Sequence, residues 1–220
     1  MHTMKCVVAA LFSLLSLGQT YDERSCDSLM EPIQVSNQEI LGKWMYIGAS
    51  SVIPGSRSLG RLLDSVWLDI TATSQSNTLN IVQTQRVKYG SCWTITYNVT
   101  FERSIMLIEQ PFYLKEVYLP TICSDCLVAW EDVIVGNDSF TSLLLFSKSR
   151  TVSPEALEMF KKQVECSRMP AIVMVDPNTE ICPDNLPQSA GLPALQSLFE
   201  NKMGHRVARL LDAVFDAFSW

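Results

Sequence analysis

Histidine and basic residues are scarce in this sequence. It has two histidines, His2 and His205, and its 17 Lys and Arg are outnumbered by 23 Asp and Glu, for a formal net charge of −6. An acidic chain without a local basic cluster repels nucleic-acid phosphates, so we do not expect nucleic-acid binding. No Gly-x-Ser-x-Gly elbow, phosphate loop or zinc signature is present. We therefore expect neither an enzyme nor a protein with a metal or another cofactor.

The sequence also lacks the run of ~20 apolar residues that a membrane span needs. Its clearest apolar segment, 6–17, follows Lys5 and ends in the small residues of 16–18, which is the pattern of a secretory signal peptide. We expect residues 1–18 to be cleaved and the mature protein to be secreted to the extracellular space. The alternatives are a buried N-terminal helix or a retained anchor.

The cysteine count fits export. Loss of Cys6 with the signal peptide leaves six of the seven cysteines, and an even number in an exported chain indicates disulfides. The spacing of Cys123 and Cys126 would suit two of the four ligands of a zinc site, or a redox-active dithiol. Without a second pair or histidines at ligand spacing, a local structural disulfide is favoured. Sequons at Asn98 and Asn137 predict glycosylation and agree with the secretory pathway.

Segments rich in Val, Ile, Thr and aromatic residues alternate with Gly, Asn-Asp or Pro between residues 40 and 147. Consecutive strands with short links predict an all-β fold, either an up-and-down barrel or a sandwich. The one long link, 50–65, could form a lid over one end of a barrel. The eight predicted strands are 42–49, 66–73, 78–89, 92–102, 104–109, 112–119, 127–135 and 140–147.

The two faces of the segment 92–102 can be assigned. A glycosylated Asn98 must face solvent, and side chains alternate along a strand, so Thr94 and Thr96 point outward with it. Every second residue between them is aromatic or aliphatic and lines the interior. These inward residues are Trp93, Ile95, Tyr97, Val99 and Phe101.

A helix is expected directly after the strands. Ser153 can cap it, Pro154 suits its first position, and Leu157, Phe160 and Val164 fall on one face that should pack against the barrel wall. A short strand over 171–175 and a linker over 183–193 follow.

A second, amphipathic helix is expected at the C-terminus. Helical periodicity continues for about six turns from Leu195. This helix either packs on its own barrel or binds a lipid surface or a partner. Its apolar residues are Leu195, Leu198, Phe199, Val207, Leu210, Leu211, Val214, Phe215 and Phe218.

The motif Gly42-Lys43-Trp44 follows a capping-box pattern at 36–39 and opens the first strand. Gly-x-Trp in this position, followed by ~100 β-rich residues and one helix, resembles the lipocalin family. Residues 41–48 and 166–170 are similar to the branch that contains α1-acid glycoprotein and apolipoprotein M, and to the fish plasma lipocalins that bind saxitoxin, tetrodotoxin or tributyltin. The resemblance covers roughly residues 26–184 and not the C-terminal helix.

The resemblance implies an eight-stranded antiparallel barrel closed at one end by Trp44. A basic residue after the last strand covers that tryptophan in the family, and Arg150 or Lys148 could do so here. We take Gly42, Trp44 and Arg150 as the structural motif. The disulfides implied by the resemblance are Cys26–Cys166, Cys92–Cys182 and, for the remaining pair, Cys123–Cys126.

The expected function is that of a carrier, because an eight-stranded barrel can hold one small ligand in a mostly apolar cavity. Arg86 and Glu109 are candidates for polar selectivity, whereas Glu131 and Asp132 lie on opposite faces of one strand and cannot converge on one substrate atom. Each lining aromatic could equally be ordinary barrel core. The candidate ligand-binding residues are Tyr46, Trp93, Ile95, Tyr97, Val99, Phe101 and Trp130, with Phe112 and Tyr118 as further candidates. The faces of Trp130, Phe112 and Tyr118 are not assigned.

The predicted organisation is a signal peptide over 1–18, a lipocalin domain over 19–184, and a linker with the amphipathic helix over 185–220. The predicted partner is a small hydrophobic ligand such as a lipid, drug, xenobiotic or toxin. The alternative function is apolipoprotein-like binding of a lipoprotein surface, a membrane or a protein partner through the C-terminal helix.

Overall fold

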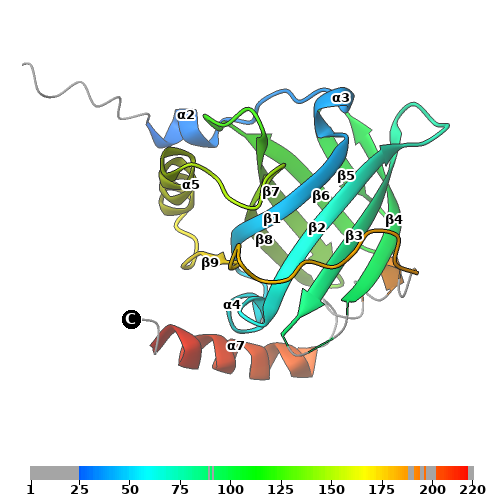
Figure 1. Cartoon of the computed structure of the whole chain (residues 1–220). Helices are drawn as coiled ribbons and strands as arrows, with labels where there is room; N and C mark the ends of the chain where they lie inside the picture. The colour runs from blue at the N-terminus through cyan, green and yellow to red at the C-terminus, as the bar shows by residue number, and fades with distance from the viewer. Residues whose placement is uncertain are drawn as a thin grey trace, which may run out of the picture.

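Eight antiparallel strands form the body of the molecule (Figure 1). The computed structural model describes residues 25–88, 90, 92–187, 191–193, 196 and 202–217. The expected signal peptide therefore lies outside the described residues. The strands are β1 (Gly42–Ser51), β2 (Leu63–Ala72), β3 (Thr78–Val87), β4 (Cys92–Glu102), β5 (Ile105–Ile108), β6 (Tyr113–Leu119), β7 (Cys126–Val135) and β8 (Asp138–Ser147).

The strands close into a barrel because β1 pairs with both β2 and β8. Its first half pairs with β2, where Met45 lies opposite Trp67. Beyond that point the short strand β9 (Val173–Met174) takes the free edge of β1, with Met174 opposite Gly48. The all-β, eight-stranded up-and-down barrel predicted from the sequence is thus confirmed.

The link between β1 and β2 is shorter than predicted. β1 continues to Ser51, whose hydroxyl lies 2.7 Å from that of Ser142 on β8, and both serines are buried. β2 begins at Leu63 rather than at residue 66. The pair of hydroxyls gives both buried serines a hydrogen-bond partner, so the ladder continues through Ser51.

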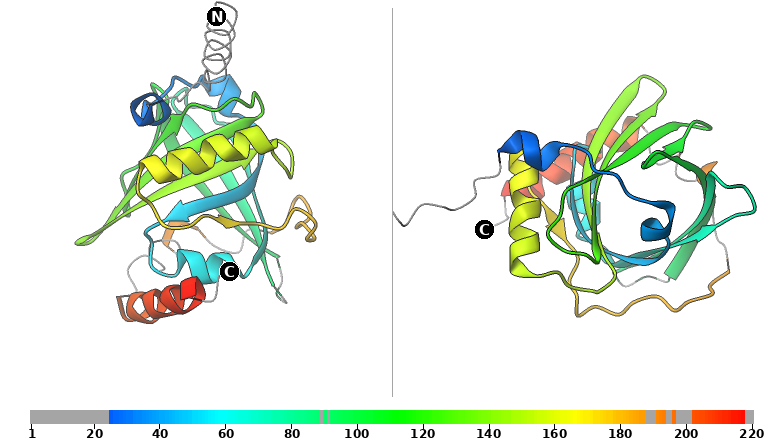
Figure 2. Two further views of the ribbon diagram at one scale, coloured as in Figure 1. Left: turned by 90° about the vertical axis from the view of Figure 1, so that its left-hand side faces the viewer. Right: turned by 90° about the horizontal axis from the view of Figure 1, so that it is seen from above.

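The two ends of the barrel differ. At one end the short helix α3 (Asn37–Ile40) is capped by Ser36, whose hydroxyl accepts a hydrogen bond from the backbone N–H of Glu39 at 3.2 Å. Seen down the barrel, α3 lies within the outline of the strands, so this is the closed end (Figure 2). The opposite, open end carries α4 (Ser56–Gly60) and the turns at 109–112 and 136–137.

The helix α5 (Pro154–Cys166) lies along the outer wall of the barrel (Figure 2). Ser153 caps it as predicted, and Phe160 and Val164 are buried in a cluster with Leu143 on β8. On the same helix, the side chain of Gln163 donates hydrogen bonds to the carbonyls of Leu29 at 3.0 Å and Pro120 at 2.8 Å. These bonds hold the N-terminal arm, including α2 (Cys26–Met30), against α5.

Three disulfides cross-link the chain in the pairs that the family resemblance implies. Cys26–Cys166 joins α2 to α5, Cys92–Cys182 joins β4 to the segment before the linker, and Cys123–Cys126 is local. The carbonyl of Cys182 accepts a hydrogen bond of 3.2 Å from the indole N–H of Trp67. The segment around Cys182 is therefore fixed to the outer face of the barrel.

The C-terminal helix α7 (Lys202–Ala217) lies at the open end beside α4 (Figures 1 and 2). Leu195, Leu198, Phe199 and Phe218 of the predicted apolar stripe lie outside the described residues. Among the helices of the described part of the chain, none is long and apolar enough to cross a membrane.

Candidate ligand-binding cavity

The barrel encloses a cavity of about 230 Å³ in its open half. A smaller space of about 40 Å³ continues from it toward Trp44 at the closed end. This volume lies below the ~300–1,000 Å³ typical of drug-sized ligands, so the cavity suits a small ligand. Its lining is Tyr46, Leu63, Val66, Leu68, Gln83, Gln85, Tyr97, Ile108, Phe112, Leu114, Glu116, Glu131, Leu144 and Phe146.

Two carboxylates face each other inside this largely apolar lining. Glu116 on β6 lies directly opposite Glu131 on β7 in the strand register. On the outer face of the same two strands, the next pair is Lys115 opposite Asp132. Like charges directly across a strand pair destabilise a sheet, whereas opposite charges stabilise it. The inward pair therefore works against folding, which is typical of a site kept for binding.

Burial changes the protonation of both carboxyl groups. It raises the pKa of Glu116 to about 7. It also raises the pKa of Glu131 to about 8, with a further contribution from the charge of Glu116. Near neutral pH the free pair therefore keeps one or both protons and can donate as well as accept hydrogen bonds. A bound cation would favour the ionised form.

Two phenols complete the polar side of the cavity. The Tyr97 hydroxyl donates a hydrogen bond of 3.4 Å to the side-chain carbonyl of Gln83, and burial raises the pKa of this phenol above its usual range. Burial acts in the same direction on the pKa of Tyr46, whose ring meets Phe146 edge-on at 5.9 Å. Both phenols stay neutral and can serve as hydrogen-bonding groups. Within the described residues, no three His, Cys, Asp or Glu side chains gather as a metal site would require.

The predicted inward face of β4 contributes less to this lining than expected. Tyr97, together with Tyr46 from β1, borders the cavity, but Trp93, Ile95, Val99 and Phe101 are not among the residues that line it. Val99 and Phe101 belong to the packed core, and Ile95 is completely buried. Val99 lies opposite Leu79 and Phe101 opposite Met106, and both of these partners are buried in the same core.

Trp130, a candidate ligand-binding residue, does not line the barrel cavity. It lies on the outer face of β7, in a separate surface pocket beside Met30 and Lys115, and its indole N–H donates to Asp132 at 3.1 Å. The inward residues of β7 are its odd-numbered neighbours, including Glu131. The sequence 126–135 is apolar on both faces because α5 and the N-terminal arm cover its outer side, so alternation could not reveal which face was which.

Neither Arg86 nor Glu109, the two candidates for polar selectivity, lines the cavity. Arg86 points away from the cavity and pairs with Glu180 at 2.9 Å, and Glu109 lies in the exposed loop after β5. Among the polar residues that border the cavity, Gln83, Gln85 and Glu116 were missed, and Glu131 was considered only together with Asp132. Gln83 and Gln85 could have been predicted, because they continue the inward alternation of Leu79 and Ile81 along the strand. The position of Glu116 opposite Glu131 depends on the strand register instead. Phe112 lines the cavity, and Tyr118 is buried in the core.

The closed end is sealed by Trp44, which is buried and donates an indole hydrogen bond of 2.8 Å to the carbonyl of Ile40. Lys148, and not Arg150 as predicted, covers it. The Lys148 ammonium lies 3.6 Å from the centre of the Trp44 ring and donates to the carbonyl of Leu41 at 2.8 Å. Arg150 instead donates to the carbonyl of Thr179, because the chain turns away from the closed end after β8.

Gly42 is explained by the same contact. Its φ of +95° disfavours other residues, and a Cβ there would come within 3.2 Å of the Lys148 ammonium. Glycine thus leaves room for the cation that covers Trp44.

We expect Lys148→Met to lower the free energy of unfolding by about 0.5–1 kcal/mol, the usual worth of an exposed cation–π contact. The Trp44 indole N–H resonance should shift as well, since the cation over its ring is removed. Urea unfolding and ¹H–¹⁵N NMR measure the two effects. Arg150→Met is the matched control. An unchanged Trp44 resonance in Lys148→Met, or an equal shift in Arg150→Met, would contradict the assignment.

The barrel, the sealed end and the cavity together define a lipocalin fold, and comparisons with known proteins agree. Residues 10–185 match the family described as the ApoM domain, so the chain belongs to that family. No curated protein matches it. Similar solved structures include a siderocalin, Ex-FABP, with 16% identity and a TM-score of 0.55 over 68% of this chain and 99% of that chain.

Two further structures show the same fold. The bovine lipocalin allergen Bos d 2 has 18% identity and a TM-score of 0.54, over 68% of this chain and 99% of that chain. The siderocalin Q83 has 15% identity and a TM-score of 0.54, over 67% and 95%. At these identities the similarity establishes the fold alone. Fold and family are together those of proteins that typically bind and carry small lipophilic ligands.

Proposed function

We propose that this protein is a secreted, non-enzymatic carrier whose cavity takes a small lipophilic ligand with a positively charged or strongly hydrogen-bond-donating group. The observation that carries the proposal is the pair Glu116 and Glu131, directly opposite each other in an otherwise apolar lining. Apolar walls would hold the body of the ligand, and the carboxylates would fix its polar end.

Secretion is supported by features of the described chain. The disulfides Cys26–Cys166 and Cys92–Cys182 suit an oxidising environment, and Asn98 and Asn137 are both exposed, as glycosylation requires. We propose cleavage of residues 1–18, a carrier domain over 19–184 and an appended segment over 185–220.

Three decyl compounds of equal chain length test the ligand class: decylamine, decanol and decanoic acid, titrated by isothermal calorimetry. We expect the amine to bind at least tenfold more tightly than the acid, because only the amine neutralises the carboxylates. Glu131→Gln should remove most of this preference, whereas Asp132→Asn, the same charge change one residue away on the outer face, should not. Equal affinities would refute the charge preference, and no binding by any compound would refute the carrier function.

Binding of decylamine should also depend on pH. The cation needs ionised carboxyls, but the raised pKa values keep Glu116 protonated below about 7 and Glu131 below about 8. The association constant should therefore rise between pH 5 and pH 8, by at most about tenfold per pH unit for each proton released, and level off above. Decanol, titrated over the same range, should show no such rise. A pH-independent affinity for the amine would contradict the proposed contact.

A further inference from the structure

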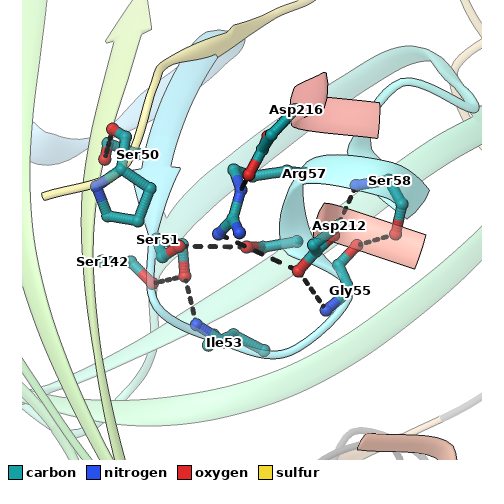
Figure 3. A network of polar contacts seen from close by, with 11 residues as sticks. Ser50, Ser51, Ile53, Gly55, Arg57, Ser58, Ser142, Asp212 and Asp216 are labelled. Atoms are coloured by element: carbon teal, nitrogen blue, oxygen red, sulfur yellow. Dashed lines mark hydrogen bonds and ion pairs between the residues drawn. The ribbon is translucent and has the colours of Figure 1, made fainter. Parts of the chain in front are cut away.

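The helix α7 is attached to the barrel by its acidic side (Figure 3). Asp212 is 2% exposed, and its carboxylate accepts hydrogen bonds from the backbone N–H groups of Gly55 at 2.9 Å and Ser58 at 2.8 Å. Asp216 accepts from the guanidinium of Arg57 at 2.9 Å. The helix is thus clamped to α4 by hydrogen bonds and an ion pair.

The apolar stripe of α7 consequently points away from the barrel. Leu210 and Val214 are each two positions from Asp212, which places them about 200° around the helix from it. They are 65% and 45% exposed, and their neighbours Val207 and Leu211 are 58% and 40% exposed. This reverses the usual arrangement, in which a surface helix buries its apolar stripe.

The rim of the open end adds to this apolar surface. Val52 and Leu62, which flank α4, are 46% and 47% exposed. Tyr113 and Ile134, opposite each other at the open ends of β6 and β7, are 36% and 48% exposed. Most of the large hydrophobic side chains that the described residues expose therefore lie at one end of the molecule.

The charge at this end selects the partner. The two acidic residues of α7 are engaged with α4, whereas Arg206 and Arg209 are exposed. The protein as a whole carries a formal charge of −6, so a basic and apolar helix is unusual on it. Apolar side chains bordered by arginine match an anionic lipid surface, where the stripe enters the acyl boundary and the guanidinium groups meet the headgroups.

We propose that the exposed stripe of α7 and the rim of the open end form one docking surface for an anionic lipid layer, with the mouth of the barrel turned toward the lipid. Because α4 joins the helix to the rim, docking of the helix also orients the cavity. A ligand could then pass between the lipid layer and the cavity without crossing bulk water. Docking itself does not require the proposed ligand class.

Sedimentation with vesicles of equimolar phosphatidylcholine and phosphatidylserine tests the docking. We expect the mature chain, residues 19–220, to bind these vesicles more tightly than pure phosphatidylcholine ones. Leu210→Asp should weaken binding at least tenfold, since burying leucine is worth about 1.5–3 kcal/mol. Ile122→Asp, at a residue 50% exposed in the closed-end loop, is the matched control and should bind like the unmodified protein. Unchanged binding by Leu210→Asp would overturn the proposal.

Hydrogen exchange tests the orientation. Vesicles should slow exchange in residues 51–62 and in α7, and leave the closed-end loop 120–125 unchanged. Equal protection at both ends, or at the closed end alone, would contradict a lipid-facing mouth. The decylamine titration in solution should be unaltered by Leu210→Asp, which separates this proposal from the carrier function. If light scattering shows a dimer that Leu210→Asp abolishes and vesicles do not bind, the stripe joins two copies and the lipid proposal is wrong.

Discussion

Replacing Glu116 and Glu131 together by glutamine is expected to stabilise the protein at pH 8 and to have little effect at pH 4. Both carboxyls have a pKa in the folded protein that is raised, to about 7 and about 8, above the value of 4.5 taken for an unperturbed Glu. As the pH rises past 4.5 the unfolded chain loses these protons first. The free energy of unfolding therefore falls until the folded carboxyls have also ionised.

The expected gain of the double variant at pH 8 is about 3 kcal/mol. If each pKa shift contributed fully, at about 1.4 kcal/mol per pKa unit for each carboxyl, the gain in the free energy of unfolding would be larger. It is smaller because the side chains border a cavity that admits water, which screens their charges. Urea unfolding at intervals between pH 4 and pH 9.5 measures the difference from the unmodified protein, which should grow up to about pH 8 and level off above it. Asp132→Asn, on the outer face, should show no such growth. A difference independent of pH would mean that the inward pair is not held protonated.

Removing a long-range disulfide is expected to have the largest effect on stability. Cys92→Ser with Cys182→Ser opens a loop of 90 residues, and Cys26→Ser with Cys166→Ser a loop of 140. The chain-entropy model gives about 4–5 kcal/mol for each. This is a large share of the roughly 5–15 kcal/mol that stabilises a typical domain.

The local disulfide provides the comparison. Cys123 and Cys126 are three residues apart, so their bond restricts the unfolded chain little. Serine at both positions should cost about 1–2 kcal/mol on the same model. Urea unfolding without reductant measures all three double variants. A loss at the local pair equal to that at Cys92–Cys182 would show that native contacts, rather than chain entropy, determine the effect.

The strand pattern predicted the barrel because most strands have one apolar and one polar face, as around Asn98. The pattern did not assign a face to Trp130, because α5 and the N-terminal arm bury the outer face of β7 as well. The strand pattern also could not predict that Glu116 lies opposite Glu131. That pairing depends on the register of β6 and β7, which no single strand encodes.

At the closed end, the sequence supplied two basic candidates for covering Trp44. Which one does so depends on where the chain turns after β8, and Lys148 remains on the correct side. The amphipathic pattern of α7 was likewise clear, but not its orientation. Periodicity shows that a helix has two faces, whereas the clamp between Asp212 and α4 determines which one meets the barrel.

The contacts that attach α7 to α4 need few specific side chains, so the C-terminal tail (residues 185–220) does not depend on one particular barrel. On the barrel side the clamp uses two main-chain amides, those of Gly55 (at a φ of +85°) and Ser58, and one arginine side chain, Arg57. On the tail side it needs aspartates one turn apart. A barrel could thus acquire such a tail by gene fusion with few compensating substitutions in its wall. By the same reasoning, residues 185–220 could be transplanted onto another barrel with a similar link between its first two strands, to direct a different cargo site to a lipid surface.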